Sequence, residues 1–122
     1  MPLAYLLDEN QRGLLWDVIQ RHNARGIDPL DAVRVGDLPE LPLGRQDPEI
    51  LLWAEAQERI LVSFDRSTLP GYLADHLAGG RHCPGIFMVS RTSRPLVVLD
   101  FLVLAAYASE PAEWRDWIKY VE

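Results

Sequence analysis

The chain has 122 residues, of which 48% are hydrophobic and 25% are charged, and its formal net charge is −6. These values are ordinary for one globular domain with a single core, so they argue against disordered and fibrous proteins. The negative charge argues against a protein that coats nucleic acid non-specifically, but it is compatible with a small acidic site that holds a metal.

Nothing in the sequence predicts export or insertion into a membrane. The longest apolar run, residues 95–108, contains Asp100 and is shorter than the roughly 20 residues that a bilayer span needs. The first ten residues lack the basic segment and the cleavage site of a secretory signal. Cys83 is the lone cysteine, which leaves no internal disulfide and no zinc site built from thiolates. We therefore expect a cytoplasmic protein that does not contact a membrane.

The first half of the chain alternates between strand and helix patterns. Residues 3–7 are apolar throughout and predict a buried strand. Residues 10–26 show apolar side chains at helical spacing before a closing glycine, which predicts a helix. Residues 31–36 alternate in the manner of a short strand, and the two prolines and the glycine in residues 39–46 indicate a loop.

The second half repeats the alternation. Residues 47–59 predict a helix with Asp47 as its N-cap and Pro48 at its first position, both of which favour helix initiation. A buried strand is expected at residues 60–64. A shorter helix at residues 67–80 ends in paired glycines.

Residues 84–91 are typical of another buried strand, residues 95–108 of a helix, and residues 117–121 of a last strand. Such alternation of strands and helices is typical of a parallel sheet that is covered by helices on both faces. No linker or repeat interrupts it. The expected fold is therefore a single α/β domain over residues 1–122, with a mainly parallel sheet flanked by helices.

Three aspartates are expected to meet at one edge of that sheet. Asp8 follows the first strand and Asp65 follows the third, so both lie at the carboxyl edge, where open α/β sheets bind their ligands. Asp47 begins the helix that leads into the third strand, and such helices start at the same edge. Carboxylate oxygens suit Mg²⁺ or Mn²⁺, and sites of this kind hydrolyse phosphodiesters with a water that the metal activates. We therefore predict Asp8, Asp47 and Asp65 as metal ligands and catalytic residues.

Each aspartate also has a purely structural interpretation. Asp47 before a proline is typical of an N-cap, and Asp8 and Asp65 are compatible with solvated strand ends. If the two strand-end carboxylates lie close together without a metal, their repulsion raises the pKa of one of them. Glu9 and Glu49 are second-tier candidates, which are also compatible with solvent-facing side chains or partners of a helix dipole.

Three stretches of the sequence resemble one protein family. The stretches "YLLDEN", "VGDLPELPLGRQDPEILLWA" and "RILVSFD" are similar to the small PIN-like proteins of the DUF5615 or Mut7-C type. The resemblance implies a three-layer, Rossmann-like PIN fold and a Mg²⁺- or Mn²⁺-dependent ribonuclease site at Asp8, Asp47 and Asp65, with Ser63 where the family often has threonine. It also implies an RNA substrate and the toxin half of a toxin–antitoxin pair, with an antitoxin-like protein as partner.

Three arginines follow strands at the same edge and are candidates for contacts with RNA phosphates. These residues are Arg66, Arg91 and Arg94. Solvated arginines are the alternative interpretation, because arginine is mostly exposed in folded proteins.

Two further functions stay open. A phosphoacceptor receiver domain would have an acidic pair after its first strand, here Asp8 and Glu9, and an acceptor after its third, here Asp65. It would also have a hydroxyl after its fourth strand, here Ser90, but the only lysine of the chain, Lys119, lies inside the expected last strand. A PIN-like domain without turnover would instead act by binding a protein partner. The oligomeric state is open, with a homodimer as one option.

Overall fold

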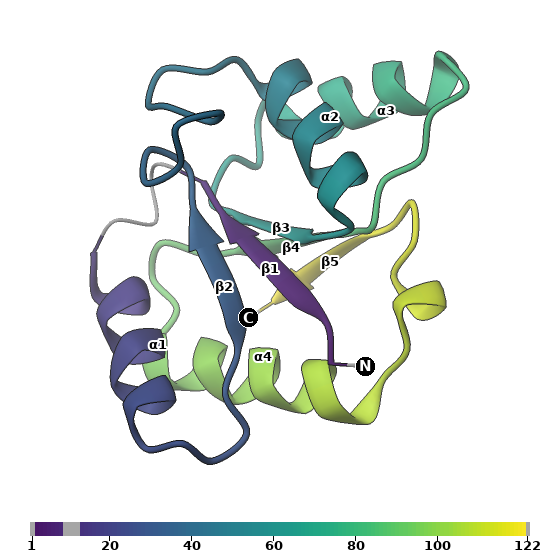
Figure 1. Cartoon of the computed structure of the whole chain (residues 1–122). Coiled ribbons are helices and arrows are strands. Elements are labelled where there is room, and N and C mark those ends of the chain that lie inside the picture. Colours follow the sequence, from purple (N-terminus) through teal and green to yellow (C-terminus); the bar gives the residue numbers. More distant parts are fainter. Residues whose placement is uncertain (1, 9–12, 122) are drawn as a thin grey trace.

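The computed structural model describes residues 2–8 and 13–121 of the chain. A parallel sheet forms its middle layer, with one pair of helices on each face (Figure 1). The strands are β1 (Ala4–Leu7), β2 (Asp31–Arg34), β3 (Ile60–Ser63), β4 (Ile86–Val89) and β5 (Ile118–Val121). The helices are α1 (Leu14–Ala24), α2 (Asp47–Gln57), α3 (Leu69–Ala78) and α4 (Pro95–Ala108), and a short 3₁₀ turn covers Pro111–Glu113.

The strands lie in the order β2-β1-β3-β4-β5, and every neighbouring pair is parallel. In this doubly wound order the chain first moves outward to β2 and then crosses back over β1 to β3. The strand order therefore reverses between β1 and β3, and ligands in open α/β sheets bind outside the carboxyl ends of the strands at such a point. The predicted three-layer, Rossmann-like α/β fold with a mainly parallel sheet is confirmed.

Both faces of the sheet are buried along its three inner strands, which explains why β1, β3 and β4 are almost continuously apolar instead of alternating. Helices α1 and α4 cover one face and helices α2 and α3 cover the other (Figure 1). Along β1, Tyr5 and Leu7 pack toward α1 and α4, whereas Leu6 packs toward α2 and α3. The Tyr5 hydroxyl donates a hydrogen bond of 2.7 Å to the carbonyl of Leu102 in α4, so this phenol anchors a helix as well as filling the core.

The start of α2 differs from the expectation by one residue. Gln46 occupies the N-cap position, and Asp47 lies in the first turn with Pro48 next to it. Assignments of helix ends vary by a residue or two, and an acid in the first turn is favoured by the helix dipole as well. Asp47 therefore stays at the helix start that the sequence predicted.

The apolar run at residues 95–108 forms α4, as expected. Within the described residues, no helix combines the length and the apolar character that crossing a membrane requires.

Candidate functional site

A serine hydroxyl joins the ends of β1 and β3 at the point where the strand order reverses. Ser63 is the last residue of β3, and its Oγ donates a hydrogen bond of 2.5 Å to Oδ2 of Asp8. The same Oγ accepts a hydrogen bond of 3.0 Å from the backbone N–H of Asp65. The Asp8 N–H in turn donates to the carbonyl of Val62 at 3.2 Å. The structure therefore brings together Asp8, Ser63 and Asp65, which lie up to 57 positions apart in the sequence.

Asp8 and Ser63 are both buried, with 8% and 1% of their surface exposed. A buried carboxylate needs hydrogen-bond donors to compensate for the loss of water, and the Ser63 hydroxyl is one of them. The bond also fixes the direction in which one carboxylate oxygen of Asp8 points. Such a fixed, acidic oxygen at a sheet edge is the kind of group that a hard cation uses as a ligand.

The Asp65 carboxylate is held by the first residues that lead into α3. Its Oδ1 accepts hydrogen bonds from the backbone N–H of Ser67 at 3.1 Å, from the Ser67 hydroxyl at 3.1 Å and from the backbone N–H of Thr68 at 3.0 Å. Its Oδ2 accepts a hydrogen bond from the Thr68 hydroxyl. These contacts resemble the capping of a helix start, so Asp65 has a structural role at α3.

The hydrogen bonds also keep Asp65 ionised. The hydroxyl and the N–H of Thr68 contribute most to lowering its pKa below the ordinary value. Partial burial opposes them, and the contacts from Ser67 lower the pKa by smaller amounts. Repulsion between neighbouring carboxylates was expected to raise the pKa of Asp8 or Asp65. The pKa of Asp65 is lowered instead, because four hydrogen-bond donors surround its carboxylate oxygens.

Asp47 and Glu49 lie in the first turn of α2. Asp47 is half-buried, whereas Glu49 is exposed and forms an ion pair of 2.7 Å with Arg45. Glu49 therefore pairs with a cation at the surface, which agrees with its alternative interpretation as a solvent-facing side chain. Glu9 lies outside the described residues.

Asp8, Asp47 and Asp65 do not make up a ready three-ligand group in the structure. Across residues 2–8 and 13–121, no three His, Cys, Asp or Glu side chains are arranged so that they could hold a metal ion. Joint metal binding by the three aspartates thus stays a prediction. Its support in the structure is the Ser63 hydroxyl, which contacts both the Asp8 carboxylate and the backbone of Asp65.

Two of the three predicted arginines line the same hollow as Asp65. Arg66 and Arg91 line an open hollow of about 460 Å³ between the carboxyl ends of β3 and β4. The other residues that line this hollow are Phe64, Asp65, Ser67, Val89 and Ser90. Arg94 occupies the N-cap position of α4, is exposed, and is not among the lining residues.

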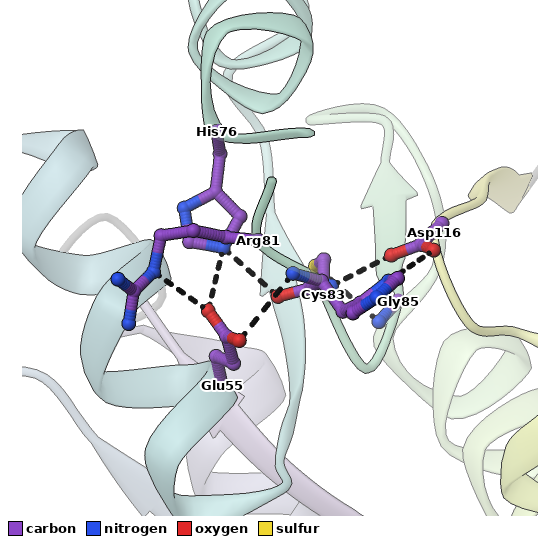
Figure 2. A network of polar contacts seen from close by, with 7 residues as sticks. Glu55, His76, Arg81, Cys83, Gly85 and Asp116 are labelled. Atoms are coloured by element: carbon purple, nitrogen blue, oxygen red, sulfur yellow. Dashed lines mark hydrogen bonds and ion pairs between the residues drawn. The ribbon is translucent and has the colours of Figure 1, made fainter. Parts of the chain in front are cut away.

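A second polar cluster, which the sequence did not indicate, lies at the opposite edge of the sheet (Figure 2). Glu55 from α2 accepts contacts from the Nε2 of His76 at 3.0 Å, from the Nε of Arg81 at 3.1 Å and from the N–H of His82 at 3.3 Å. Asp116, just before β5, accepts the Cys83 N–H at 2.7 Å and lies 3.0 Å from the Nδ1 of His82. We call these residues the amino-edge network.

The amino-edge network ties four segments together and leaves its thiol inert. Burial raises the pKa of Cys83 to about 11, so the thiolate that would act as a nucleophile or ligand is scarce at neutral pH. The two histidines of the network each contact a carboxylate, His76 that of Glu55 and His82 that of Asp116.

Comparisons of the chain with family models, with curated proteins and with solved structures find no significant match. The resemblance to the PIN-like proteins therefore stays a prediction.

Proposed function

We propose that the protein is a Mg²⁺- or Mn²⁺-dependent ribonuclease whose metal is held by Asp8 and Asp65, with Asp47 as the third acidic residue at the same edge. The observation that carries the proposal is the Ser63 hydroxyl, which links the Asp8 carboxylate to the backbone of Asp65 where the strand order reverses. The predicted RNA substrate and antitoxin-like partner, the homodimer and the cytoplasmic location belong to this proposal as well.

The residues present fit such an ion. The side chains concerned offer oxygen atoms alone, which is the donor type that Mg²⁺ and Mn²⁺ prefer. The lowered pKa of Asp65 keeps its carboxylate in the charged form that binds a cation. A divalent ion bound here would supply charge neutralisation and an activated water for hydrolysis of a phosphodiester.

The chain itself contributes orientation. Ser63 holds one oxygen of Asp8, and Ser67 and Thr68 hold both oxygens of Asp65, so the two carboxylates are fixed before any ligand arrives. Preorganised groups of this kind lose little freedom on binding. We therefore expect removal of the Ser63 hydroxyl to weaken metal binding although serine is not itself a proposed ligand.

The strand order favours a second candidate function, a phosphoacceptor receiver domain, because receivers use the same order. In this interpretation Asp65 accepts the phosphoryl group and Asp8 belongs to the acidic pair that holds the ion. Lys119 lies within β5, as the sequence predicted, and is not placed after it. A PIN-like binding module without turnover differs from both in having no reaction to measure.

The test is cleavage of a fluorescent single-stranded RNA in the presence of Mn²⁺, Mg²⁺ or EDTA. We expect metal-dependent cleavage that Asp8→Asn abolishes and that Asp116→Asn, a matched change at the opposite edge, leaves intact. Cleavage that survives EDTA or Asp8→Asn would contradict the proposal. Incubation with acetyl phosphate and Mg²⁺ separates the second candidate, which requires a phosphoryl group on Asp65.

A further inference from the structure

The hollow between the ends of β3 and β4 is rich in donors for an oxyanion. Arg66 and Arg91 supply two guanidinium groups, and Ser67 and Ser90 supply hydroxyls. Its volume of about 460 Å³ lies within the roughly 300–1,000 Å³ that small-molecule sites occupy. The lining thus has both the size and the chemistry for a small anionic ligand.

The two guanidinium groups rest on aromatic rings. The guanidinium carbon of Arg66 lies 5.3 Å from the ring centre of Tyr120, and that of Arg91 lies 5.2 Å from the ring centre of Phe64. Neither group belongs to an ion pair in the part of the chain that the structure describes. Arginine stacks on aromatic faces and still presents a planar fork of N–H donors that matches a phosphate. The rings therefore position two cations that form no ion pair with a carboxylate of residues 2–8 or 13–121.

Charge around the hollow favours an anion despite the presence of Asp65. Two guanidinium groups face one carboxylate, and that carboxylate already accepts hydrogen bonds from Ser67 and Thr68. Among the described residues that line the hollow, the balance of charge is positive in a chain whose net charge is −6. This contrast marks the hollow as a site for a negative group.

We propose that this hollow binds the phosphate group of a nucleotide, with Arg66 and Arg91 as its ligands. Tyr120 is 44% exposed, so an aromatic base can lie beside the Arg66–Tyr120 pair while its phosphate reaches the two arginines. The inference rests on the proposed function in one respect, since the bound phosphate would belong to the nucleic-acid substrate next to the metal-binding acids. Binding itself requires neither the metal nor hydrolysis.

The test measures binding without metal. Adenosine monophosphate, inorganic phosphate and adenosine are titrated in EDTA at low salt into ¹⁵N-labelled protein, and the affinities are read from amide shifts. We expect adenosine monophosphate to bind more tightly than inorganic phosphate, and adenosine to bind most weakly. Arg66→Gln and Arg91→Gln should each weaken the nucleotide about tenfold, the loss of one charge-assisted contact of roughly 1.4 kcal/mol. Arg21→Gln, an exposed change on α1, is the matched control and should have no effect.

Three outcomes would overturn the inference: no nucleotide binding, equal binding of adenosine and its monophosphate, or unchanged binding in both arginine variants. The Asp8→Asn variant separates the inference from the proposed function. If it loses metal-dependent cleavage and keeps nucleotide binding in EDTA, both stand. If the native protein binds the nucleotide and never cleaves RNA, the proposed function fails and the inference holds.

Discussion

The two edges of the sheet use their charged residues in different ways. At the amino edge, the carboxylates of Glu55 and Asp116 contact Arg81 and the two histidines as well as backbone N–H groups, and they tie the ends of α2 and α3 to the start of β5 (Figure 2). At the carboxyl edge, Asp65 accepts hydrogen bonds from amides and hydroxyls, and Arg66 and Arg91 stack on rings.

We take this difference to distinguish a structural cluster from the proposed site. At the amino edge the Arg81 guanidinium compensates part of the charge of Glu55, which leaves less of that charge to attract a ligand. Carboxylates held by neutral donors keep their charge, and arginines held by rings keep theirs. Changes at the amino edge should therefore alter stability, and changes at the carboxyl edge should alter binding.

The largest loss of stability is expected for Gly85→Ala at the amino edge. Gly85 has φ +134, and a Cβ there would lie 2.8 Å from the carbonyl oxygen of Trp114 and 3.0 Å from its Cβ. Strain and overlap together should lower the free energy of unfolding by about 3 kcal/mol, measured by urea denaturation.

Gly71→Ala is the matched control for that substitution. Gly71 lies in α3, and an added Cβ would have no heavy atom within 4 Å. Alanine at this position should raise the free energy of unfolding by up to about 1 kcal/mol, because it favours a helix more than glycine does. Equal effects of the two changes would contradict the close packing of β4 against the Trp114 segment.

The next largest effect is expected for Asp116→Ala. Asp116 has φ 65 and accepts the N–H of the buried Cys83 at 2.7 Å. Alanine removes this acceptor and must adopt a left-handed conformation that it disfavours. We expect a loss of about 2 kcal/mol in thermal or urea unfolding. Asparagine tolerates this conformation and keeps an acceptor, so Asp116→Asn should recover about half of the loss. Reduced Mn²⁺ binding in either variant would contradict the separation of the two edges.

A smaller effect on stability, with a larger effect on binding, is expected for Ser63→Ala. The substitution removes the bond to Asp8 and should cost about 1 kcal/mol in unfolding. Loss of a group that orients a ligand typically weakens a metal site about 10- to 100-fold, and calorimetric titration with Mn²⁺ measures this. Ser109→Ala also removes a hydroxyl that bonds within the protein, but far from the proposed site, and should leave Mn²⁺ binding unchanged. If the Ser63→Ala protein binds Mn²⁺ as tightly as the native protein does, Ser63 has no role in the proposed site.

The smallest expected effect is a dependence of stability on acid pH. Burial acts to raise the pKa of Glu55, but hydrogen bonds from His82 and Arg81 hold it below its ordinary value of 4.5. A carboxyl whose pKa is lower in the folded state stabilises the fold above its unfolded pKa and loses this contribution as the pH falls through the folded pKa. The stability difference between the native protein and Glu55→Gln should therefore be constant above about pH 5.5 and shrink below 4.5.

Because the ion pair between Glu55 and Arg81 is partly exposed to solvent, the difference in stability between the native protein and Glu55→Gln should reach at most about 1 kcal/mol. Urea denaturation at a series of pH values measures it. A difference that grows as the pH falls would mean that Glu55 is not stabilised in its ionised form.

The carboxyl edge was largely predictable from the sequence because strand ends are local features. The apolar runs that become β1 and β3 stop at acids, and parallel strands place their ends together. The capping contacts of Asp65 also have a signal in the sequence, since an aspartate followed two and three residues later by Ser67 and Thr68 is typical of a helix start. The strand order was not predictable, because it depends on which crossover packs against which face.

The amino-edge network could not be found in the sequence. The contacts of its two carboxylates join residues 21 to 34 positions apart, from α2, α3, the loop after α3 and the turn before β5. No spacing rule links such positions, and each residue alone is typical of a solvated surface. The arginine contacts with Tyr120 and Phe64 likewise depend on how β4 and β5 lie beside β3.

The most direct test of the central claim is to locate a paramagnetic ion in the folded protein. Mn²⁺ added in substoichiometric amounts to ¹⁵N-labelled protein broadens the amide signals nearest to the bound ion. The account predicts that the signals of Ser63, Asp65 and their neighbours broaden first, that those of Cys83 and Asp116 do not, and that Asp8→Asn removes the effect. First broadening at the amino-edge network, or identical broadening in Asp8→Asn, would contradict it.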